Sequence, residues 1–306
     1  MDLRSVNSVS KIFGINVQSY VPLTEKTAKI KCENNNCFFL KETELYTNEK
    51  YNLLYNQRNE SFLYPKRIND KFVVSLNNKL YILSDYHQSI NITDEYKSIH
   101  MMNQLSDLHR STQYKKVLSK ESSRKKMEDL YEYLQYKFSV LESFVRSVEC
   151  SEFDENSIMI LKNYQYILDA KKIMAKYNKK LIVDIKNNKS VYYAFIHNKP
   201  KLSHLLVSDS GNYLVSIENS KMGIPSLDIV KYYLYNENLN IDIKQIILDY
   251  FSSYEDEFYF NYFCFFVMVY YIKGIVVLEK DYVTSQSFVY AALKLNKFIK
   301  MFELKE

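Results

Sequence analysis

The four cysteines are the first residues whose spacing could support chemistry. Cys32 and Cys37 flank a tetrapeptide, Glu-Asn-Asn-Asn, whereas Cys150 and Cys264 stand alone. No two cysteines form a CxxC pair and no histidine lies at zinc-finger spacing, so the sequence predicts no metal site. A four-residue hairpin loop would place Cys32 opposite Cys37, close enough for a cross-strand disulfide. In a reducing cytosol the same two residues would stay free thiols, and that alternative is favoured there.

The sequence lacks the patterns of a nucleophilic hydrolase. There is no G-x-S-x-G motif, and the 5 histidines have no obvious serine or cysteine partner. Glycine, which lets a backbone approach phosphate closely, occurs only 4 times in 306 residues. The missing motif argues against a hydrolase, and four glycines are few for a nucleotide-binding enzyme.

The segment from residue 191 to 235 carries the most specific pattern. It reads VYYAFIHNKPKLSHLLVSDSGNYLVSIENSKMGIPSLDIVKYYLY. This segment resembles the catalytic region of aminoglycoside phosphotransferases and choline kinases, which have a protein-kinase-like fold. Within that superfamily it is most similar to the CotS branch of spore-coat proteins. These proteins carry H-G-D-x-x-x-x-N, a short β-hairpin, D-x-D, and then a proline before a helix that opens with Asp-Leu.

The resemblance implies that several site residues are retained. Lys41, at the end of a strand, matches the lysine that pairs with nucleotide phosphates. His197 matches the loop histidine and should point inward, with a hydrogen bond to backbone near residues 216–217. Glu218 falls at the second acidic position of D-x-D. Asp228 matches the acid of Asp-Leu, where it would cap the following helix or tie down the loop.

The same resemblance marks the positions that depart from the family pattern. Lys199 replaces the carboxylate that orients or deprotonates the attacking hydroxyl, and a protonated lysine cannot accept a hydrogen bond. His204 replaces the asparagine and Ser216 the first aspartate, which both hold Mg²⁺ in the family; this is a poor exchange, because magnesium prefers hard oxygen ligands. The segment 20–26, in the place of the phosphate-binding loop, has no glycine. Loss of the base alone would lower the rate by about 10²–10⁴.

These departures predict a pseudokinase: a kinase-like protein that is not an enzyme, with no catalytic residue, no metal and no cofactor. By resemblance it would be made in the cytoplasm and serve as a structural or interaction component of the spore coat, with other coat proteins as partners. Two alternatives stay open. One is an atypical small-molecule phosphotransferase, and the other is a nucleotide-binding regulator without turnover.

Charged groups left in such a site should pair with one another, because unpaired charges are costly to bury. We expect Lys41 or Lys199 to lie within salt-bridge distance of an acid. The candidate acids are Glu218 and, from the helix of the first lobe, Glu44 and Glu49.

The elements that position these residues can be read from the apolar pattern. The first 86 residues predict a small antiparallel β lobe that consists of a hairpin, a helix and a second hairpin. The two hairpins comprise residues 27–32 with 37–41 and residues 72–76 with 79–83, and the helix covers 42–55. Asparagine-rich turns join the strands of each hairpin.

Residues 87–306 predict a larger, mainly helical lobe that carries the altered catalytic loop. Apolar residues step by three or four from Met127 to Val148, and less strictly from Ile158 to Tyr177. Short strands are expected at 181–185, 191–196 and 213–217, and helices at 243–251, 258–272 and 285–302. The predicted fold class is therefore α+β, a two-lobed protein-kinase-like fold.

Composition sets the remaining limits. A net charge of +5 over 306 residues is too mild to indicate nucleic-acid binding. The apolar run from Phe258 to Val277 is nearly long enough to cross a bilayer, but it contains Asn261 and Lys273. We interpret it as a buried core helix rather than a membrane span. The first 20 residues lack the apolar stretch of a secretory signal.

Overall fold

The computed structural model describes residues 1–118, 120–187, 189–277 and 282–305. These residues form two compact units. Unit 1 comprises Met1–Tyr114, Ala194–Gly223 and Tyr235–Ile241, and unit 2 comprises Lys115–Tyr193, Ile224–Leu234 and Asp242–Glu306. The chain passes between the units several times, so neither unit is one continuous segment.

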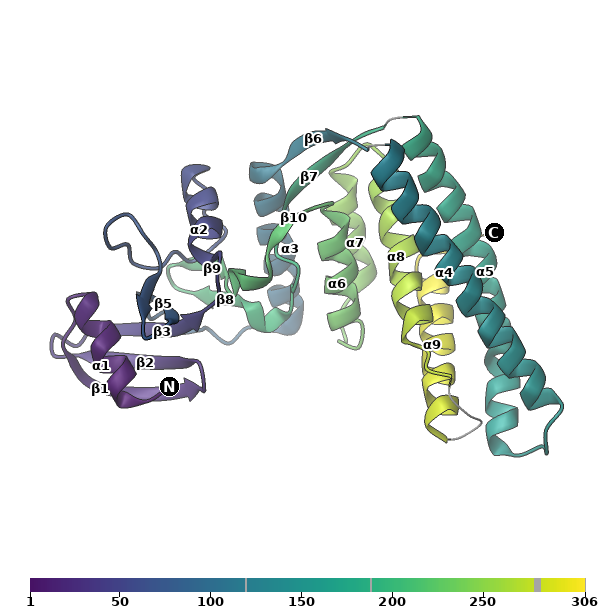
Figure 1. The fold of residues 1–306 in the computed structure, drawn as a ribbon, viewed down its shortest axis with the longest axis horizontal. Helices are drawn as coiled ribbons and strands as arrows, with labels where there is room; N and C mark the ends of the chain where they lie inside the picture. Colours follow the sequence, from purple (N-terminus) through teal and green to yellow (C-terminus); the bar gives the residue numbers. More distant parts are fainter. Residues whose placement is uncertain (119, 188, 278–281, 306) are drawn as a thin grey trace. The chain divides into compact units, whose positions relative to one another are not determined.

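Unit 1 contains a five-stranded antiparallel sheet with the strand order β1-β2-β3-β5-β4 (Figure 1). The strands are β1 (Val17–Thr24), β2 (Thr27–Cys32), β3 (Cys37–Thr43), β4 (Val74–Leu76) and β5 (Lys79–Asp85). Helix α1 (Leu3–Ile12) packs on this sheet through Val6 and Val9, which are fully buried with Ile30, Leu40 and Leu83. This apolar cluster is the core that holds β3 in place.

Both predicted hairpins are confirmed, and their turns use asparagine for a physical reason. Asn77 and Asn78, between β4 and β5, have φ of 51° and 61°. Asparagine tolerates this left-handed conformation better than most residues, and two such residues in a row are typical of a type I′ turn. In the first hairpin, Lys31 rather than Cys32 pairs with Cys37, and both cysteines are free thiols.

The helix of the first lobe begins later than the sequence predicts. Helix α2 spans Thr47–Asn56 instead of residues 42–55. Strand β3 continues to Thr43, which pairs with Leu80 of β5, so residues 42 and 43 belong to the sheet. The prediction of a helix start at residue 42 was wrong because it did not account for the pairing of β3 with β5.

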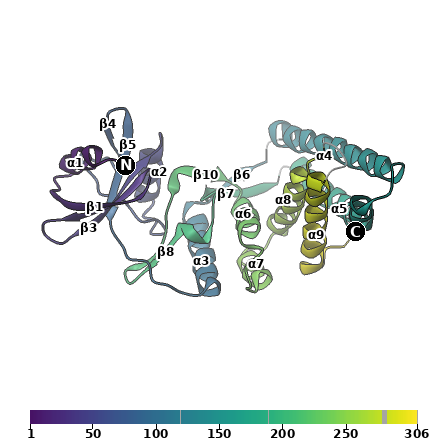
Figure 2. The same cartoon turned by 90° about the horizontal axis from the view of Figure 1, so that it is seen from below.

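The rest of unit 1 carries the predicted catalytic loop. Its elements are α3 (Asp94–Thr112), the end of β7 (Ser190–Ile196), η1 (Leu202–His204), β8 (Leu205–Ser208), β9 (Gly211–Leu214), η2 (Ile217–Asn219) and β10 (Lys221–Gly223). Strands β8 and β9 form a hairpin, and β10 pairs with the end of β7, as Figure 2 shows. The loop that follows β7 is thereby fixed at both ends by strand pairing.

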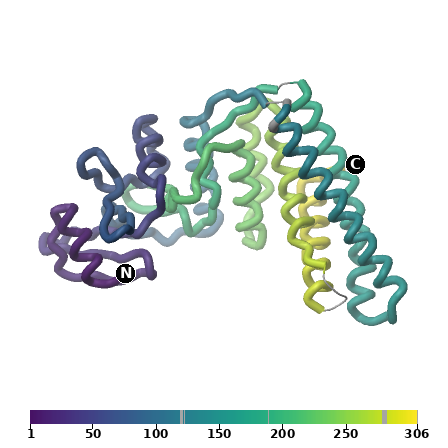
Figure 3. Tube along the Cα trace, viewed as in Figure 1, coloured from purple at the N-terminus to yellow at the C-terminus, as the bar shows by residue number. Residues whose placement is uncertain are grey.

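Unit 2 is helical. It contains α4 (Lys120–Glu149), α5 (Glu155–Lys186), most of α6 (Ser226–Asn236), α7 (Ile243–Ser252), α8 (Phe258–Gly274) and α9 (Tyr282–Met301), and strand β6 (Tyr114–Val117) enters it. Helix α5 packs against α4, α8 and α9, and these four helices run side by side in Figure 3. The predicted strand at 181–185 is wrong, because these residues are the last turns of α5. Leu181 and Ile185, four residues apart, lie on one buried helix face.

Helix α8 is the buried core helix that the sequence predicts. Phe263, Cys264, Phe265 and Val267 are all fully buried, so apolar residues on most sides of this helix face neighbours. Phe263 contacts the ring of Phe298 at a centroid distance of 5.7 Å. Among the described residues, no helix has the length and apolarity to cross a membrane.

The predicted α+β fold class is confirmed, with an antiparallel sheet and a larger set of helices. The predicted lobe division at residues 86 and 87 stays a prediction. Unit 1 contains the first 86 residues but also α3 and the segment Ala194–Gly223. All the altered loop positions therefore lie in the same compact unit as Lys41.

Candidate functional site

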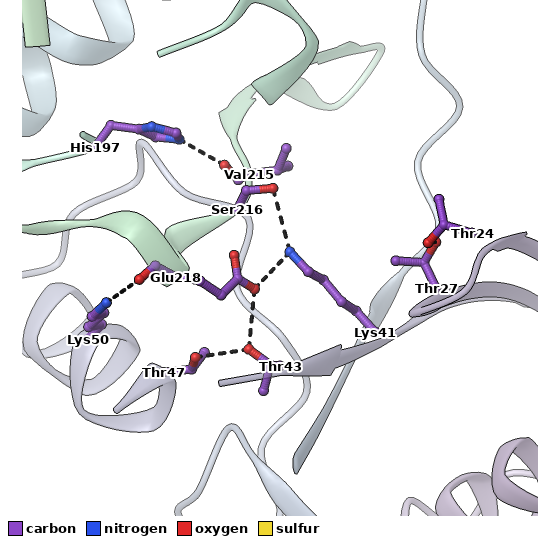
Figure 4. A network of polar contacts seen from close by, with 10 residues as sticks. All are labelled: Thr24, Thr27, Lys41, Thr43, Thr47, Lys50, His197, Val215, Ser216 and Glu218. Carbon is purple, nitrogen blue, oxygen red and sulfur yellow. Dashed lines mark hydrogen bonds and ion pairs between the residues drawn. The ribbon is translucent and has the colours of Figure 1, made fainter. Parts of the chain in front are cut away.

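An ion pair between Lys41 and Glu218 lies at the centre of the site (Figure 4). Lys41 Nζ, on β3, is 2.7 Å from Oε1 of Glu218, in η2, and the two side chains are only 19% and 9% exposed. Lys41 Nζ also donates to Ser216 Oγ at 3.5 Å, and Thr43 Oγ1 donates to Glu218 Oε1 at 3.2 Å. The prediction that a lysine pairs with Glu218 is confirmed.

Helix α2 supports this pair from the other side. Lys50 Nζ donates to the backbone carbonyl of Glu218, and the Thr47 and Thr43 hydroxyls are 2.9 Å apart. The helix thus contributes a lysine, not the acids Glu44 or Glu49. Sequence reasoning missed Thr43 and Lys50. A signal existed for Thr43, because residues two apart on a strand point to the same face.

The charge state of Glu218 follows from two opposing effects. Burial favours the neutral carboxyl, but the charge and hydrogen bond of Lys41, with the donated bond from Thr43, outweigh it and hold the pKa of Glu218 below its ordinary value. Burial also lowers the pKa of Lys50, against the charges of Glu218 and Glu44. At neutral pH Glu218 is therefore a carboxylate.

His197 orders the loop, as the resemblance implies. Its Nε2 donates to the carbonyl of Val215 at 2.8 Å, one residue before the predicted 216–217, and its Nδ1 accepts from the backbone N–H of Lys199 at 3.2 Å. The ring is fully buried and stacks on Phe62 with centroids 5.8 Å apart. Both ring nitrogens are used by the backbone, so His197 has a positioning role.

His204 differs, because within the described part of the chain only one of its ring nitrogens forms a hydrogen bond. Its Nδ1 is 2.9 Å from the carbonyl of Lys199, which can only accept, so Nδ1 carries the proton. Burial, together with the positive charges of Lys199 and Lys41, lowers the pKa of His204 to about 4. The ring is therefore neutral at pH 7, and its Nε2 is a hydrogen-bond acceptor.

Lys199 and Ser216 both line a small pocket. Among the described residues, no carboxylate lies within salt-bridge distance of Lys199, so the predicted ion pair forms through Lys41 alone. The pocket has a volume of about 180 Å³, and its wall includes Lys26, Lys41, Lys199, His204, Ser216 and Glu218. Ser216 has φ of 67°, an uncommon conformation for a residue other than glycine.

A larger cavity adjoins this pocket and shares Lys41 and Ser216 with it. Its volume is about 480 Å³, within the range of about 300–1,000 Å³ that is typical of small-molecule sites. Apolar side chains from the sheet and from β8 form much of its wall, among them Phe39, Ile82 and Leu205. Sequence reasoning did not predict it, because it depends on how β3, β5 and β8 face one another.

Asp228 lies in unit 2, where it is fully buried. Helix α6 begins at Ser226, so Asp228 stands inside the first turn and is not the cap of a helix that starts at residue 229. A carboxylate in a first turn still stabilises a helix through its dipole. The predicted helix start at residue 229 is therefore corrected, and the alternative role, that Asp228 ties down the loop, stays a prediction.

The donor atoms present do not fit a magnesium ion. The described residues contain no group of three His, Cys, Asp or Glu side chains that could hold a metal. The carboxylate of Glu218 already accepts from Lys41 and Thr43, and the other two positions offer a hydroxyl from Ser216 and an imidazole from His204. Proteins usually hold Mg²⁺ through one or two carboxylates, with water and substrate phosphates as the other ligands, and here the single carboxylate at these positions is paired with a lysine.

Comparison with known proteins places the fold. No protein-family model and no curated protein matches the chain. An aminoglycoside phosphotransferase from Alicyclobacillus acidocaldarius matches with a TM-score of 0.59 at 9% identity, over 94% of this chain and 92% of that one. A spectinomycin phosphotransferase bound to AMP matches with a TM-score of 0.55 at 14% identity, over 99% and 94%. The amicoumacin kinase hAmiN gives 0.53 at 10%, over 97% and 94%.

These neighbours correct one prediction. They are named as phosphotransferases and kinases, and they contradict the prediction that the chain is not an enzyme. That prediction treated Lys199, His204 and Ser216 only as losses, and it could not foresee that the His204 ring is neutral and keeps an acceptor nitrogen. At these low sequence identities, the structural similarity shows the fold alone. The chain has the kinase-like fold of the aminoglycoside phosphotransferases.

Proposed function

We propose that the protein is an atypical small-molecule phosphotransferase that takes its phosphoryl group from a nucleoside triphosphate. The observation that carries the proposal is the position of Lys41, which is held by Glu218 at the boundary between the small pocket and the larger cavity. A buried carboxylate that fixes a lysine beside an apolar cavity suits a phosphate chain attached to a flat base.

The larger cavity suits the nucleoside. Phe39 and Ile82 offer an apolar wall for a base, while Ser84 and His87 supply polar groups around it. Phosphates that extend from this cavity would meet Lys41 first and the small pocket next, because both cavities share that lysine.

Phosphoryl transfer needs one bond to form as another breaks. An acceptor hydroxyl would attack the terminal phosphorus, the bond to the departing nucleoside diphosphate would break, and the hydroxyl proton would pass to His204 Nε2. The pKa of His204, about 4, is close to that of an ordinary aspartate, which is about 3.9, so its basicity matches the carboxylate that is missing. Lys41 and Lys199 would offset the charge on the transferring group.

The neighbours' names suggest the acceptor class. Aminoglycosides, spectinomycin and amicoumacin are small molecules, and the proposal for this chain is likewise a small-molecule acceptor. The assay below therefore varies the acceptor.

The test is release of ADP from ATP by the purified chain with a panel of small hydroxyl and amino acceptors. We expect acceptor-dependent release, and a loss of about 10²–10³ in rate for Lys41→Ala, because one donor aimed at the reacting charge is removed. Lys31→Ala is the matched control, since Lys31 is an exposed lysine on the neighbouring strand. Release equal to the buffer rate with every acceptor, from a chain that circular dichroism shows to be folded, would reject the proposal.

The CotS resemblance adds a proposal about location. It implies that the protein acts in the spore coat with other coat proteins, and its support is the sequence segment 191–235. A fluorescent fusion followed through sporulation tests it. Signal that stays diffuse in the mother cell, with none on the forming spore, would count against the location while leaving the chemistry open.

A further inference from the structure

Cationic side chains converge on the small pocket from several elements. Lys26 comes from the turn between β1 and β2, Lys41 from β3 and Lys199 from the loop after β7. Lys50 of α2 reaches the same acid as Lys41, through its backbone carbonyl. Three lysines from three segments therefore line the pocket together with Glu218, and a fourth, Lys50, binds the backbone of that residue.

The acids around the pocket do not cancel this charge. Glu42 is paired with Lys79 at 2.8 Å, and Glu218 is paired with Lys41. Glu44 is exposed. Counting Lys50 and Lys79, the pocket region holds more lysines than acids, and within the described residues Lys26 and Lys199 have no carboxylate in salt-bridge range.

The neutral groups are arranged in a way that also favours an anion. Ser216 accepts from Lys41, so its own O–H can donate outward. His204 adds no negative charge. A divalent cation in this pocket would lie beside two lysines, Lys41 and Lys199, and Oε1 of Glu218 already accepts from Lys41 and Thr43.

We infer that this pocket binds the polyphosphate of a nucleotide directly and requires no metal ion. The side chain of Lys199 would supply the positive charge that a divalent metal would otherwise supply. The inference rests on the proposed function, because it concerns the same nucleotide. It makes a specific claim about preference: the free nucleotide should bind at least as well as its magnesium complex, since Mg²⁺ neutralises charges that the lysines would otherwise contact.

Calorimetric titration with ATP, and with inorganic tripolyphosphate, tests the inference in excess EDTA and in excess MgCl₂. We expect binding of both in EDTA, with a Kd for ATP equal to or lower than that measured with MgCl₂. Lys199→Gln should raise the Kd in EDTA by about tenfold, which corresponds to about 1.4 kcal/mol. Lys31→Gln, with the same loss of charge on an exposed part of the sheet, should leave the Kd unchanged.

A gain-of-dependence variant makes the result sharper. Lys199→Asp with Ser216→Asp restores two carboxylates, and we expect this chain to bind ATP only when MgCl₂ is present. ATP binding by the unmodified chain that disappears in EDTA would overturn the inference and leave the proposed function standing. Absence of ATP binding under both conditions would instead reject the proposed function, and the inference with it.

Discussion

Glu218 shows how much of the site depends on one side chain. Its side chain is only 9% exposed, and it accepts from both Lys41 and Thr43. The sequence could predict the ion pair, because a buried lysine and a buried acid without a metal need each other. It could not predict Lys50 or the neutral state of His204, because these depend on a helix face and on one backbone carbonyl.

Replacement of Glu218 should therefore destabilise the protein in a pH-dependent way. We expect Glu218→Gln to lower the free energy of unfolding at pH 7 by about 1–3 kcal/mol, because Lys41 loses its charged acceptor. The pKa of Glu218 is lowered by folding, so its contribution is present above the unfolded value and is lost as the pH falls through the folded pKa. Urea unfolding of both chains from pH 7 to pH 3 measures the difference.

The matched control for this measurement is Glu303→Gln. Glu303 also has a lowered pKa and an ion pair, with Lys244, but it is an exposed pair on the surface of unit 2. We expect it to change the unfolding free energy little at any pH. A Glu218→Gln chain as stable as the unmodified one at pH 7 would show that the ion pair does not hold the site together.

At the scale of elements, local pattern succeeded where it was unambiguous. The two hairpins and the long amphipathic helices follow from turn residues and from three- and four-residue steps, both of which act locally. The failures have tertiary causes. Residues 42–43 join the sheet because β5 pairs with them. Residues 181–185 continue α5, where Leu181 and Ile185 are buried on one face of the helix.

The turn between β4 and β5 allows a test at this scale. Asn77 has φ of 51°, where an alanine side chain is strained, so Asn77→Ala should cost about 1 kcal/mol of stability. Asn36→Ala is the control, because Asn36 lies in the other hairpin turn and does not have a positive φ. Equal stability of the two variants in urea unfolding would contradict the assignment of a left-handed turn at residues 77–78.

At the scale of the whole molecule, the chain is interleaved rather than divided in sequence. Unit 1 collects residues from three separate stretches, which no local pattern could reveal. The catalytic-type loop comes from Ala194–Gly223, yet it contacts residues of the first stretch. Leu214 N–H donates to the carbonyl of Ser61 at 2.6 Å, and Ile90 N–H donates to that of Val207 at 2.8 Å.

These contacts predict that residues 1–91 stay attached to the remainder after the chain is cut. A specific protease site placed between Asn91 and Ile92 lies in a segment without helix or strand, just before α3. After cleavage we expect the two pieces to elute together from a gel-filtration column under native conditions. The Lys41–Glu218 pair, the backbone bonds at Leu214 and the Asn59–Ser111 hydrogen bond of 2.7 Å all cross the cut.

The cut chain also distinguishes two possibilities: that the two pieces are independent, and that contacts across the cut hold them together. Elution in urea should split the pieces, which controls for incomplete cleavage. If they separate without denaturant, residues 1–91 and the rest are independent of each other, and the ion pair is not enough to join them. If they stay together but Glu218→Gln makes the cut chain fall apart, then the buried pair that positions Lys41 for phosphate is also part of what holds unit 1 together.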